Sequence, residues 1–445
     1  MTSEKIERFC GIQNYSTPKN QIYGKLKTRP EDFIVEEIDL DGHTCKICDN
    51  NNLNHVQDIS NKFIEFLLVK KNLDTYEAIR LISSKLNIPK GFISFAGMKD
   101  KRALTCQRMS AHKSHKEVLK SIKINNIKIY NVKSINNPVK LGDLYGNYFT
   151  ITVRDILESP EEITKHVESK IKAIESGNGV LNYFGLQRFG DVRPITHICG
   201  KFLLKNDIES CIKTYLYYVC EDEVPLHKEF RLNLLNQWNL KQAIREIPRN
   251  LYYEKRIIEE LIKNEDYLKA FSIFPSTLQR LFVNAYQSFI FNKYISKKSI
   301  IFLEKKGFNL NDQVMILDEM GLPTKIVQTV NSFNKDHLMR LKTHHRACLT
   351  APLIGYETKK VDDILIDLLQ EEEINIEDFK FKKFKDLSSK GLFRPIFFNP
   401  KNLQLLKIRK DRIFKNKNKL ILTFKLKKGT YGTILLREII KNKKN

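Results

Sequence analysis

The chain has 445 residues, of which 42% are hydrophobic, and this length predicts two or three domains with sizeable cores. No apolar run approaches the roughly 20 residues of a membrane span, and Met1–Lys5 begins no signal peptide, so we expect a cytoplasmic protein without a membrane partner. The formal net charge of +24 favours a polyanionic partner, RNA or DNA before a membrane surface.

The positive charge is concentrated near the C-terminus. Residues 380–445 contain 21 Lys and Arg but only Asp386, Asp411 and Glu438 as acids, which places 18 of the 24 net charges there. A general bias toward lysine codons would spread the charge evenly. The clustering therefore predicts a basic face.

The first 190 residues alternate between strand and helix patterns. We expect an early strand over 25–38, a helix over 74–87 capped by Asp74 or Thr75, strands over 92–97, 103–110 and 148–153, and a helix near 160–175. Pro89 and Gly91 are expected to end the helix over 74–87. No internal repeat or low-complexity linker interrupts this part.

From about 206 to 375 the pattern becomes mostly helical. The clearest helix is expected over 278–295, with a cap near Ser276 or Thr277 and an apolar stripe at helical spacing. An acidic helix over 361–373 closes this stretch, and strand character returns over 419–426. The helical middle therefore resembles an insertion into an outer domain formed by both ends of the chain.

Two segments have residue types suited to chemistry. In FAGMKDKRALTCQ (95–107), Asp100 is the one acid among cations that would keep it ionised and could hold phosphates; an ordinary charged turn is the alternative. LNYFGLQRFG (181–190) fits neither an amphipathic helix nor an alternating strand, which is typical of a site loop. Phe184 in it is either a stacking surface for a base or a core aromatic.

Three weaker signals accompany them. Lys27 in KTRPEDF is either a carboxylate partner or a solvated lysine, and KKGTYGTILLRE (427–438) either approaches a nucleic-acid backbone or is a hairpin. In the helix over 278–295, Asn284, Gln287, Ser288 and Asn292 lie away from the apolar stripe. Cys45 and Cys48 form a single CxxC, with His43 and Cys10 as conceivable further ligands, and without a second CxxC we expect no metal site.

Taken in this order, KTRPEDFIVEE, FAGMKDKRALTCQ, NYFGLQRFG, AYQSFIFN and KGTYGTILLRE resemble the TruD family of pseudouridine synthases. The matching segments run from residue 27 to residue 438. The resemblance implies that Asp100 is catalytic, that Lys27 pairs with it, and that Asn182 and Phe184 hydrogen-bond to and stack on the target uracil. It further implies a set of basic RNA contacts: Lys99, Lys101, Arg102, Arg188 and Arg394.

The implied reaction breaks the C1′–N1 bond of a uridine, turns the uracil and rejoins it through C5. A carboxylate near the sugar would stabilise positive charge at C1′, add covalently, or remove the C2′ proton, and the sequence leaves these three open. The implied reaction needs neither a metal nor an organic cofactor, and we expect none. Gly177–Gly179 is too short for a nucleotide-binding fingerprint. Relatives often have a basic pair before the proline where this chain has Phe393 and Arg394.

The implied fold is α+β, a pseudouridine-synthase core with a mixed, largely antiparallel sheet, split by an inserted α/β domain. We expect core residues 1–205, an insertion over 206–390 and a basic core segment over 391–445. The expected partner is tRNA, modified at uridine 13 of the D arm by a monomer. The alternatives are a synthase acting on other RNAs and an inactive RNA-binding or chaperone protein. A methyltransferase should have a glycine-rich cofactor loop, and none is seen.

Overall fold

The computed structural model describes the chain except for residues 1–2, 20–21, 48–61, 191, 360 and 444–445. It divides into two compact units. The sheet unit comprises residues 16–180 and 398–445, and the helical unit comprises residues 1–15 and 181–397. The domain boundaries predicted at 205/206 and 390/391 both fall within the helical unit. The division into compact units does not test where the inserted domain begins and ends, so these boundaries remain a prediction.

The sheet unit is built from strands that the two ends of the chain contribute together. Its elements are β1 (Ile22–Gly24), β2 (Phe33–Ile38), β3 (Phe63–Lys71), α2 (Thr75–Leu86), β4 (Ser94–Phe95), β5 (Leu104–His112), α3 (Lys116–Ser121), β6 (Ile127–Ile135), β7 (Gly146–Ile156), α4 (Pro160–Ser176), β14 (Lys401–Lys410), β15 (Asn418–Lys427), α15 (Gly432–Ile439) and β16 (Ile440–Asn442).

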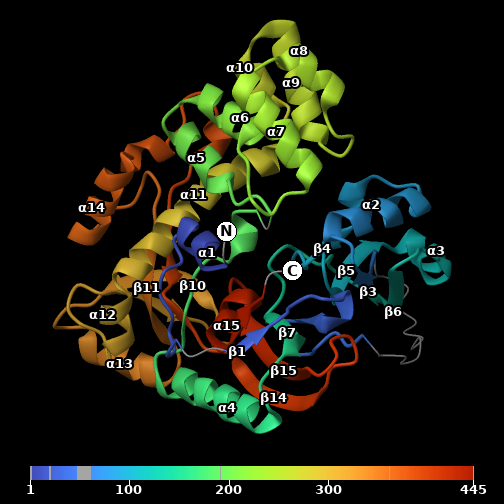
Figure 1. Cartoon of the computed structure of the whole chain (residues 1–445). Helices are drawn as coiled ribbons and strands as arrows, with labels where there is room; N and C mark the ends of the chain where they lie inside the picture. Colours follow the sequence, from blue (N-terminus) through green and yellow to red (C-terminus); the bar gives the residue numbers. More distant parts are fainter. Residues whose placement is uncertain (1–2, 20–21, 48–61, 191, 360, 444–445) are drawn as a thin grey trace. The chain divides into compact units, whose positions relative to one another are not determined.

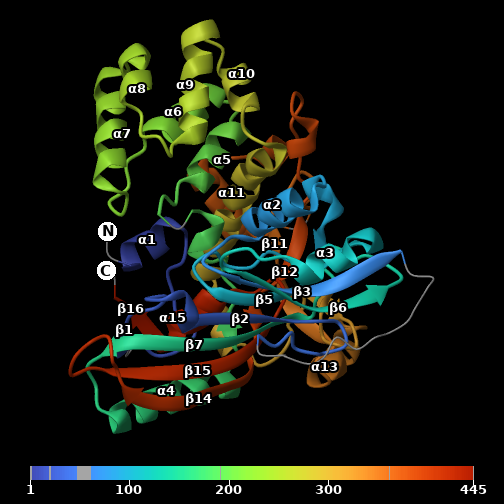
Figure 2. The same cartoon turned by 90° about the vertical axis from the view of Figure 1, so that its right-hand side faces the viewer.

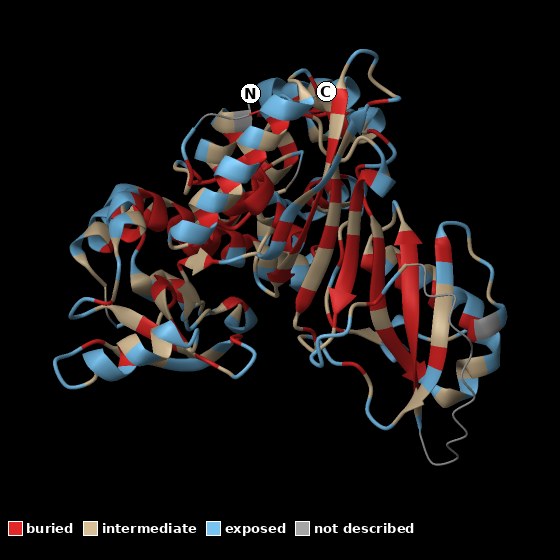
Figure 3. Cartoon of the chain, turned by 90° about the horizontal axis from the view of Figure 1, so that it is seen from below, coloured by how far each residue is buried: buried red, intermediate tan, exposed pale blue. Residues whose placement is uncertain are grey.

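Among the described residues the main sheet has eight strands in the order β14-β15-β7-β2-β5-β3-β6, with β4 paired to β5 (Figure 2). β2 and β5 are parallel, and their other partners in this sheet are antiparallel. Buried residues follow the central strands (Figure 3). The predicted α+β class with a mixed, largely antiparallel sheet is confirmed.

Helix α2 shows why the local pattern was readable. Asp74 accepts a hydrogen bond from the N–H of Glu77, so the side-chain cap lies where the sequence predicted it. Ala78, Ile79 and Ile82 are buried against β3 and β5. The helix ends earlier than Pro89, because Asn87 adopts a left-handed conformation with φ 54°.

The predicted strand over 92–97 is largely wrong. Lys90–Phe92 forms a 3₁₀ turn and only Ser94–Phe95 pairs with β5. Similarly, the strand expected over 25–38 is interrupted by a 3₁₀ turn at Pro30–Asp32, and β2 begins at Phe33. Proline and glycine at these positions favour turns over continuous pairing.

The helical unit also contains a smaller sheet. Its elements are α1 (Ser3–Phe9), α5 (Thr196–Leu204), α6 (Ile208–Tyr217), α7 (Pro225–Gln237), α8 (Leu240–Glu246), α9 (Tyr252–Asn264), α10 (Tyr267–Ser272), α11 (Ser276–Lys297), α12 (Ser299–Glu304), β9 (Gln313–Leu317), β10 (Pro323–Thr329), α13 (Lys335–Thr343), β11 (Ala347–Leu353), α14 (Asp363–Glu372) and β12 (Leu392–Pro395). The short strands β8 (Val180–Leu181) and β13 (Phe397–Phe398) occur where the chain passes between the units.

Helix α11 is the centre of the helical unit and runs alongside α5 (Figure 1). Its predicted cap at Ser276 or Thr277 is wrong, because Pro275 precedes the first turn without a side-chain cap. The side expected to be polar is not left to solvent: Gln287, Ser288 and Asn292 are buried. Their amides and hydroxyl instead bond within the protein, which makes α11 a scaffold for neighbouring loops.

The C-terminal segment KKGTYGTILLRE is not a hairpin. Residues 432–439 form α15, and Gly429, with φ 82°, provides the turn that leads into it from β15.

Candidate active site

Asp100 lies in the irregular segment 96–103 between β4 and β5, hereafter the Asp100 turn. Three side chains hold its backbone. The Nζ of Lys70 donates to the carbonyl oxygens of Asp100 at 2.8 Å and Lys99 at 3.3 Å, and the N–H of Lys99 donates to Oγ1 of Thr75 at 3.0 Å. The Nε2 of Gln107 donates to the carbonyl oxygen of Gly97 at 3.0 Å. The turn is therefore held from β3, from α2 and from β5.

The side chain of Asp100 meets Lys27. The Nζ of Lys27 lies 3.0 Å from Oδ1 of Asp100, and about a fifth to a quarter of each side chain is exposed (22% and 24%). Lys27 precedes β2, has φ 54°, and places its ammonium 4.2 Å from the centroid of the Phe33 ring. The pairing predicted for these two residues is thus present as a charge-assisted hydrogen bond, with Asp100 still open to solvent.

Lys99 does not occupy the position expected of an RNA contact. Its Nζ lies 2.6 Å from Oε2 of Glu37, and the two side chains are 2% and 0% exposed. Glu37 also lies 3.5 Å from Nε of Arg108. A phosphate cannot reach a buried ammonium, so this placement argues against the predicted phosphate contact and makes Lys99 an anchor of the Asp100 turn.

The two following cations point outward. Lys101 is exposed, with its Nζ 3.7 Å from Oε2 of Glu77, and Arg102 is exposed as well. The Asp100 turn therefore combines an inward anchor with outward positive charge. Contact of Lys101 and Arg102 with RNA remains a prediction.

Asn182 and Phe184 lie in the helical unit and are both buried, at 3% and 5% exposure. The Nδ2 of Asn182 donates to the carbonyl oxygen of Pro395 at 2.9 Å, and its Oδ1 accepts from Nη2 of Arg394 at 2.8 Å. The guanidinium of Arg394 lies 4.0 Å from the centroid of Phe184, and that of Arg188 lies 5.3 Å from it. These four predicted residues form one cluster, hereafter the Phe184 cluster.

Sequence reasoning did not recognise what holds Phe184 in place. The Oδ1 of Asn292, on α11, accepts from the N–H of Phe184 at 2.8 Å, and its Nδ2 donates to the carbonyl oxygen of the same residue at 3.1 Å. The ring of Phe291 contacts Phe184 edge to face, with centroids 5.6 Å apart. The AYQSFIFN segment carried a signal, an asparagine inside an aromatic run, but its partner lies 108 residues away.

One glycine of the NYFGLQRFG segment is required by its surroundings. Gly190 has φ +106°, and a Cβ there would lie 2.3 Å from the carbonyl oxygen of Arg193. Only glycine combines this conformation with such a close approach. The irregular path predicted for this segment is confirmed.

Of the CxxC pair the structure describes only Cys45, which belongs to no group of candidate metal ligands among the described residues. Cys45 is buried among Leu67, Val69 and Cys106, and burial raises the pKa of its thiol to about 12, which disfavours the thiolate that metals bind. Cys48 lies outside the described residues. Asp39, Asp41 and His43 group in one turn within 4.8 Å, where the His43 side chain is 82% exposed, and such exposed acidic groups are common without an ion.

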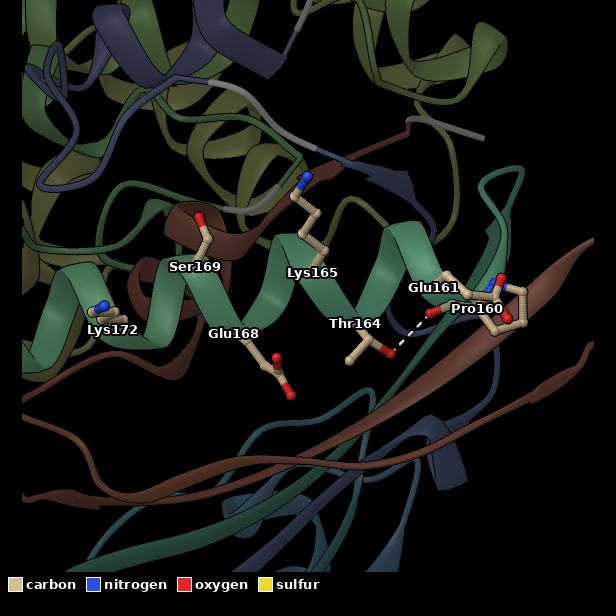
Figure 4. Close-up of a pocket in the computed structure, with 7 residues that line it drawn as sticks. All are labelled: Pro160, Glu161, Thr164, Lys165, Glu168, Ser169 and Lys172. Atoms are coloured by element: carbon tan, nitrogen blue, oxygen red, sulfur yellow. Dashed lines mark hydrogen bonds between the residues drawn. The ribbon is translucent and has the colours of Figure 1, made fainter.

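A hollow beside α4 is a poor alternative site. It is lined by residues of that helix alone: Pro160, Glu161, Thr164, Lys165, Glu168, Ser169 and Lys172 (Figure 4). Lys165 and Ser169 point to one side of the helix, whereas Thr164 and Glu168 point to the other, and Oγ1 of Thr164 bonds to the carbonyl oxygen of Pro160 at 2.8 Å. Binding sites need polar groups that converge, and these diverge.

None of the described helices combines the length and the apolar character that crossing a bilayer requires.

Comparison with known proteins identifies the family of the chain. The model of the family described as tRNA pseudouridine synthase D (TruD) matches residues 9–439. A protein of Methanococcoides burtonii named "Probable tRNA pseudouridine synthase D" is 34% identical over 98% of this chain and 97% of its own length. A protein of Methanosarcina acetivorans with the same name is 33% identical over 99% and 98%.

A crystal structure described as that of a TruD protein from Methanosarcina mazei superposes with a TM-score of 0.80, at 33% identity and 99% coverage of both chains. The predicted fold of the pseudouridine-synthase type is thereby confirmed. The chain belongs to the tRNA pseudouridine synthase D (TruD) family.

Proposed function

We propose that this pseudouridine synthase isomerises uridine 13 in the D arm of tRNA and that Asp100 is its catalytic carboxylate. The observation that carries the proposal is the 3.0 Å pair between Lys27 and Asp100, held on a turn whose backbone is fixed from three elements. A carboxylate in this setting is paired with a cation yet partly exposed, so a ribose can approach it.

The proposed chemistry balances without a cofactor. The C1′–N1 bond breaks, a C1′–C5 bond forms, N1 gains a proton and C5 loses one to solvent. Positive charge develops at C1′ as the first bond breaks, and a preorganised carboxylate stabilises that charge without having to reorganise. Lys27 keeps the carboxylate oriented through its charge-assisted hydrogen bond.

The Phe184 cluster supplies the base-binding part of the proposal. We propose that a detached uracil turns on the ring of Phe184, where stacking contributes roughly 1–3 kcal/mol. Because Phe184 is 5% exposed and the Arg394 guanidinium lies 4.0 Å from the centroid of its ring, Arg394 has to move aside for a base to stack there. The Asn182 amide is bonded to Arg394 and Pro395. A direct hydrogen bond from Asn182 to uracil would therefore have to replace one of these bonds, and we propose that the amide first serves to orient Arg394.

The test uses tRNA labelled with tritium at uracil C5, because isomerisation releases that label. Asp100→Asn keeps the size of the side chain but removes its charge, and we expect release to stop while tRNA affinity stays within about threefold. Asp41→Asn, at an exposed position of the same unit, is the matched control and should release label at the wild-type rate. Replacing U13 by C in the substrate should also stop release.

Three results would contradict this proposal. Label release by Asp100→Asn at the wild-type rate would remove the catalytic role. Binding of tRNA without release by the wild-type protein would favour the RNA-binding or chaperone alternative. Undiminished release from the U13→C substrate would move the target to another uridine.

A further inference from the structure

Lys70 is a buried cation that none of the sequence motifs pointed to. It lies on β3, its exposure is 0%, and its Nζ donates to the carbonyl oxygens of Leu73 at 2.7 Å, Asp100 at 2.8 Å and Lys99 at 3.3 Å. All three acceptors supplied by the described residues are main-chain oxygens. Lys70 thus holds the backbone of the Asp100 turn, whereas Lys27 holds the side chain of Asp100.

Burying this charge is costly, and packing alone does not require it. An isolated ammonium loses most of its hydration in an interior, and an apolar side chain of similar volume is often better tolerated there. Burial lowers the pKa of Lys70 to about 8, while the nearby carboxylates of Asp100 and Asp74 act in the opposite direction. The charge of Lys70 therefore interacts favourably with the proposed catalytic group.

The neighbouring residue on the strand is different. Lys71 is partly exposed and pairs at the surface with Glu31. Two adjacent lysines thus have opposite surroundings, and the inner one points its ammonium at the turn that carries Asp100.

We propose that Lys70 is a positioning residue for the reaction, fixing the main chain at residues 99 and 100 and adding a second positive charge beside the Asp100 carboxylate. This inference rests on the proposed catalytic role of Asp100. A carboxylate displaced by about 1 Å from its reacting atom loses on the order of 10²-fold in rate. The hydrogen bonds from Lys70 to the main chain of residues 99 and 100, hereafter the Lys70 clamp, therefore affect turnover rather than tRNA binding.

The charge of Lys70 also makes the clamp dependent on pH. The groups that face it are Asp100 and Lys99 from the Asp100 turn and Asp74 at the start of α2. β5 and β6 place the non-titrating Thr105 and Ile127 opposite it. Deprotonation above pH 8 removes one donor and the second positive charge, so turnover should decline through that pH.

The experiment compares Lys70→Met with Lys71→Met on full-length protein, using tritium release from tRNA. We expect Lys70→Met to lower kcat by about 10²-fold with KM changed less than threefold. Lys71→Met should keep both constants. A folded Lys70→Met protein with wild-type kcat, or with a change confined to KM, would overturn the inference.

Lys70→Arg gives a second readout if the methionine variant does not fold. Arginine stays protonated at all accessible pH values, so the decline of kcat near pH 8 should disappear in this variant. Its persistence would show that Lys70 does not cause the decline. If Asp100→Asn still released label, the proposed function itself would be contradicted. If Asp100→Asn were inactive and Lys70→Met fully active, only the inference about Lys70 would be contradicted.

Discussion

The guanidinium of Arg394 lies 4.0 Å from the centroid of the Phe184 ring and thus covers an aromatic surface that we propose for the target uracil. The same guanidinium donates to both Oδ1 and the carbonyl oxygen of Asn182. Arg394 was predicted as an RNA contact. Its contacts favour a role in orienting Asn182 and Phe184, the residues that we propose to bind the base, and its contact with RNA remains a prediction.

Arg394→Gln tests these two roles against each other. A side chain that orients Phe184 and Asn182 should, when removed, lower kcat by about tenfold and leave the salt dependence of tRNA affinity unchanged. Loss of a phosphate contact would instead reduce the slope of log affinity against log salt by about 1. The measurement is tRNA affinity between low and moderate salt, together with turnover at saturating tRNA. A reduced slope with full kcat would restore the phosphate assignment.

Phe184→Leu removes the flat ring while keeping an apolar side chain. If the ring stacks on uracil, turnover should fall by roughly 10- to 100-fold, in line with the 1–3 kcal/mol of a base–aromatic contact. Phe189→Leu, in the same segment, is the matched control, because Phe189 is fully buried and packs on His197 with ring centroids 5.3 Å apart. That control should lower thermal stability but not kcat of the folded enzyme. Equal turnover in both variants would argue against stacking.

The basic hairpin formed by residues 407–419 is expected to contact the tRNA backbone. Asp411 is its one acid and is neutralised internally, since Arg154 donates to it at 3.0 Å. Lys407 and Lys415 are exposed. We expect the double variant Lys407→Gln/Lys415→Gln to weaken binding and to lower the salt slope by up to about 1.8, at about 0.9 per phosphate contact.

The control for the hairpin removes the same charge elsewhere. Lys165 and Lys172 are exposed on α4, so Lys165→Gln/Lys172→Gln changes net charge identically. If both double variants alter the slope equally, the effect is one of overall charge, and the hairpin is not a specific RNA contact.

Local patterns sufficed for much of the fold. Helix α2 follows from a capping aspartate and a helical apolar repeat, and α4 and β7 follow from equally regular patterns. The strand expected over 92–97 was largely wrong, because Gly91 and Gly97 lie on either side of the short paired part, Ser94–Phe95, and glycine favours turns. The sequence of β3 does not alternate between apolar and polar residues, because both faces of this strand are buried and seven of its nine residues are inside the protein.

The site was only partly predictable, because contacts between residues distant in the sequence determine it. Asp100 and Lys27 are polar residues in distinctive segments, but the direction in which Lys99 points is set by Glu37, a residue 62 positions away on β2. Lys70 stands beside Lys71 at the end of an apolar run, where a lysine is ordinarily solvated, and no motif includes it. Periodicity reports which side of an element is apolar, and it does not report which distant carbonyl oxygens a buried ammonium will meet.

The pH dependence of stability gives an independent measure of the pKa of Lys70 in the folded protein. Its pKa in the folded protein is about 8, below the ordinary 10.5, so between these pH values the unfolded chain binds more protons than the folded one. The contribution of Lys70 to the free energy of unfolding therefore rises with pH across this window. Urea unfolding should show that, from pH 7.5 to pH 10, the free energy of unfolding rises more for the wild type than for Lys70→Met. An equal gain would show that Lys70 keeps its ordinary pKa.

Asn292 allows the support of the Phe184 cluster to be separated from its chemistry. Its amide bonds to both main-chain groups of Phe184 and also donates to the carbonyl oxygen of Cys10 at 3.0 Å, with 0% exposure. Asn292→Leu leaves buried polar groups without partners, each costing about 1–3 kcal/mol. We expect a clear loss of thermal stability, and, at temperatures where the variant is folded, turnover reduced at least tenfold because Phe184 is no longer held.

Asn284→Leu on the same helix is the matched control, since Asn284 is exposed. It should leave melting temperature and kcat close to those of wild type. If Asn292→Leu lost stability but turned over at the wild-type rate when folded, the contact between α11 and Phe184 would serve folding alone. A parallel loss of kcat with unchanged tRNA affinity would instead show that the buried amide on α11 fixes the position of Phe184, the ring on which we propose that the uracil turns.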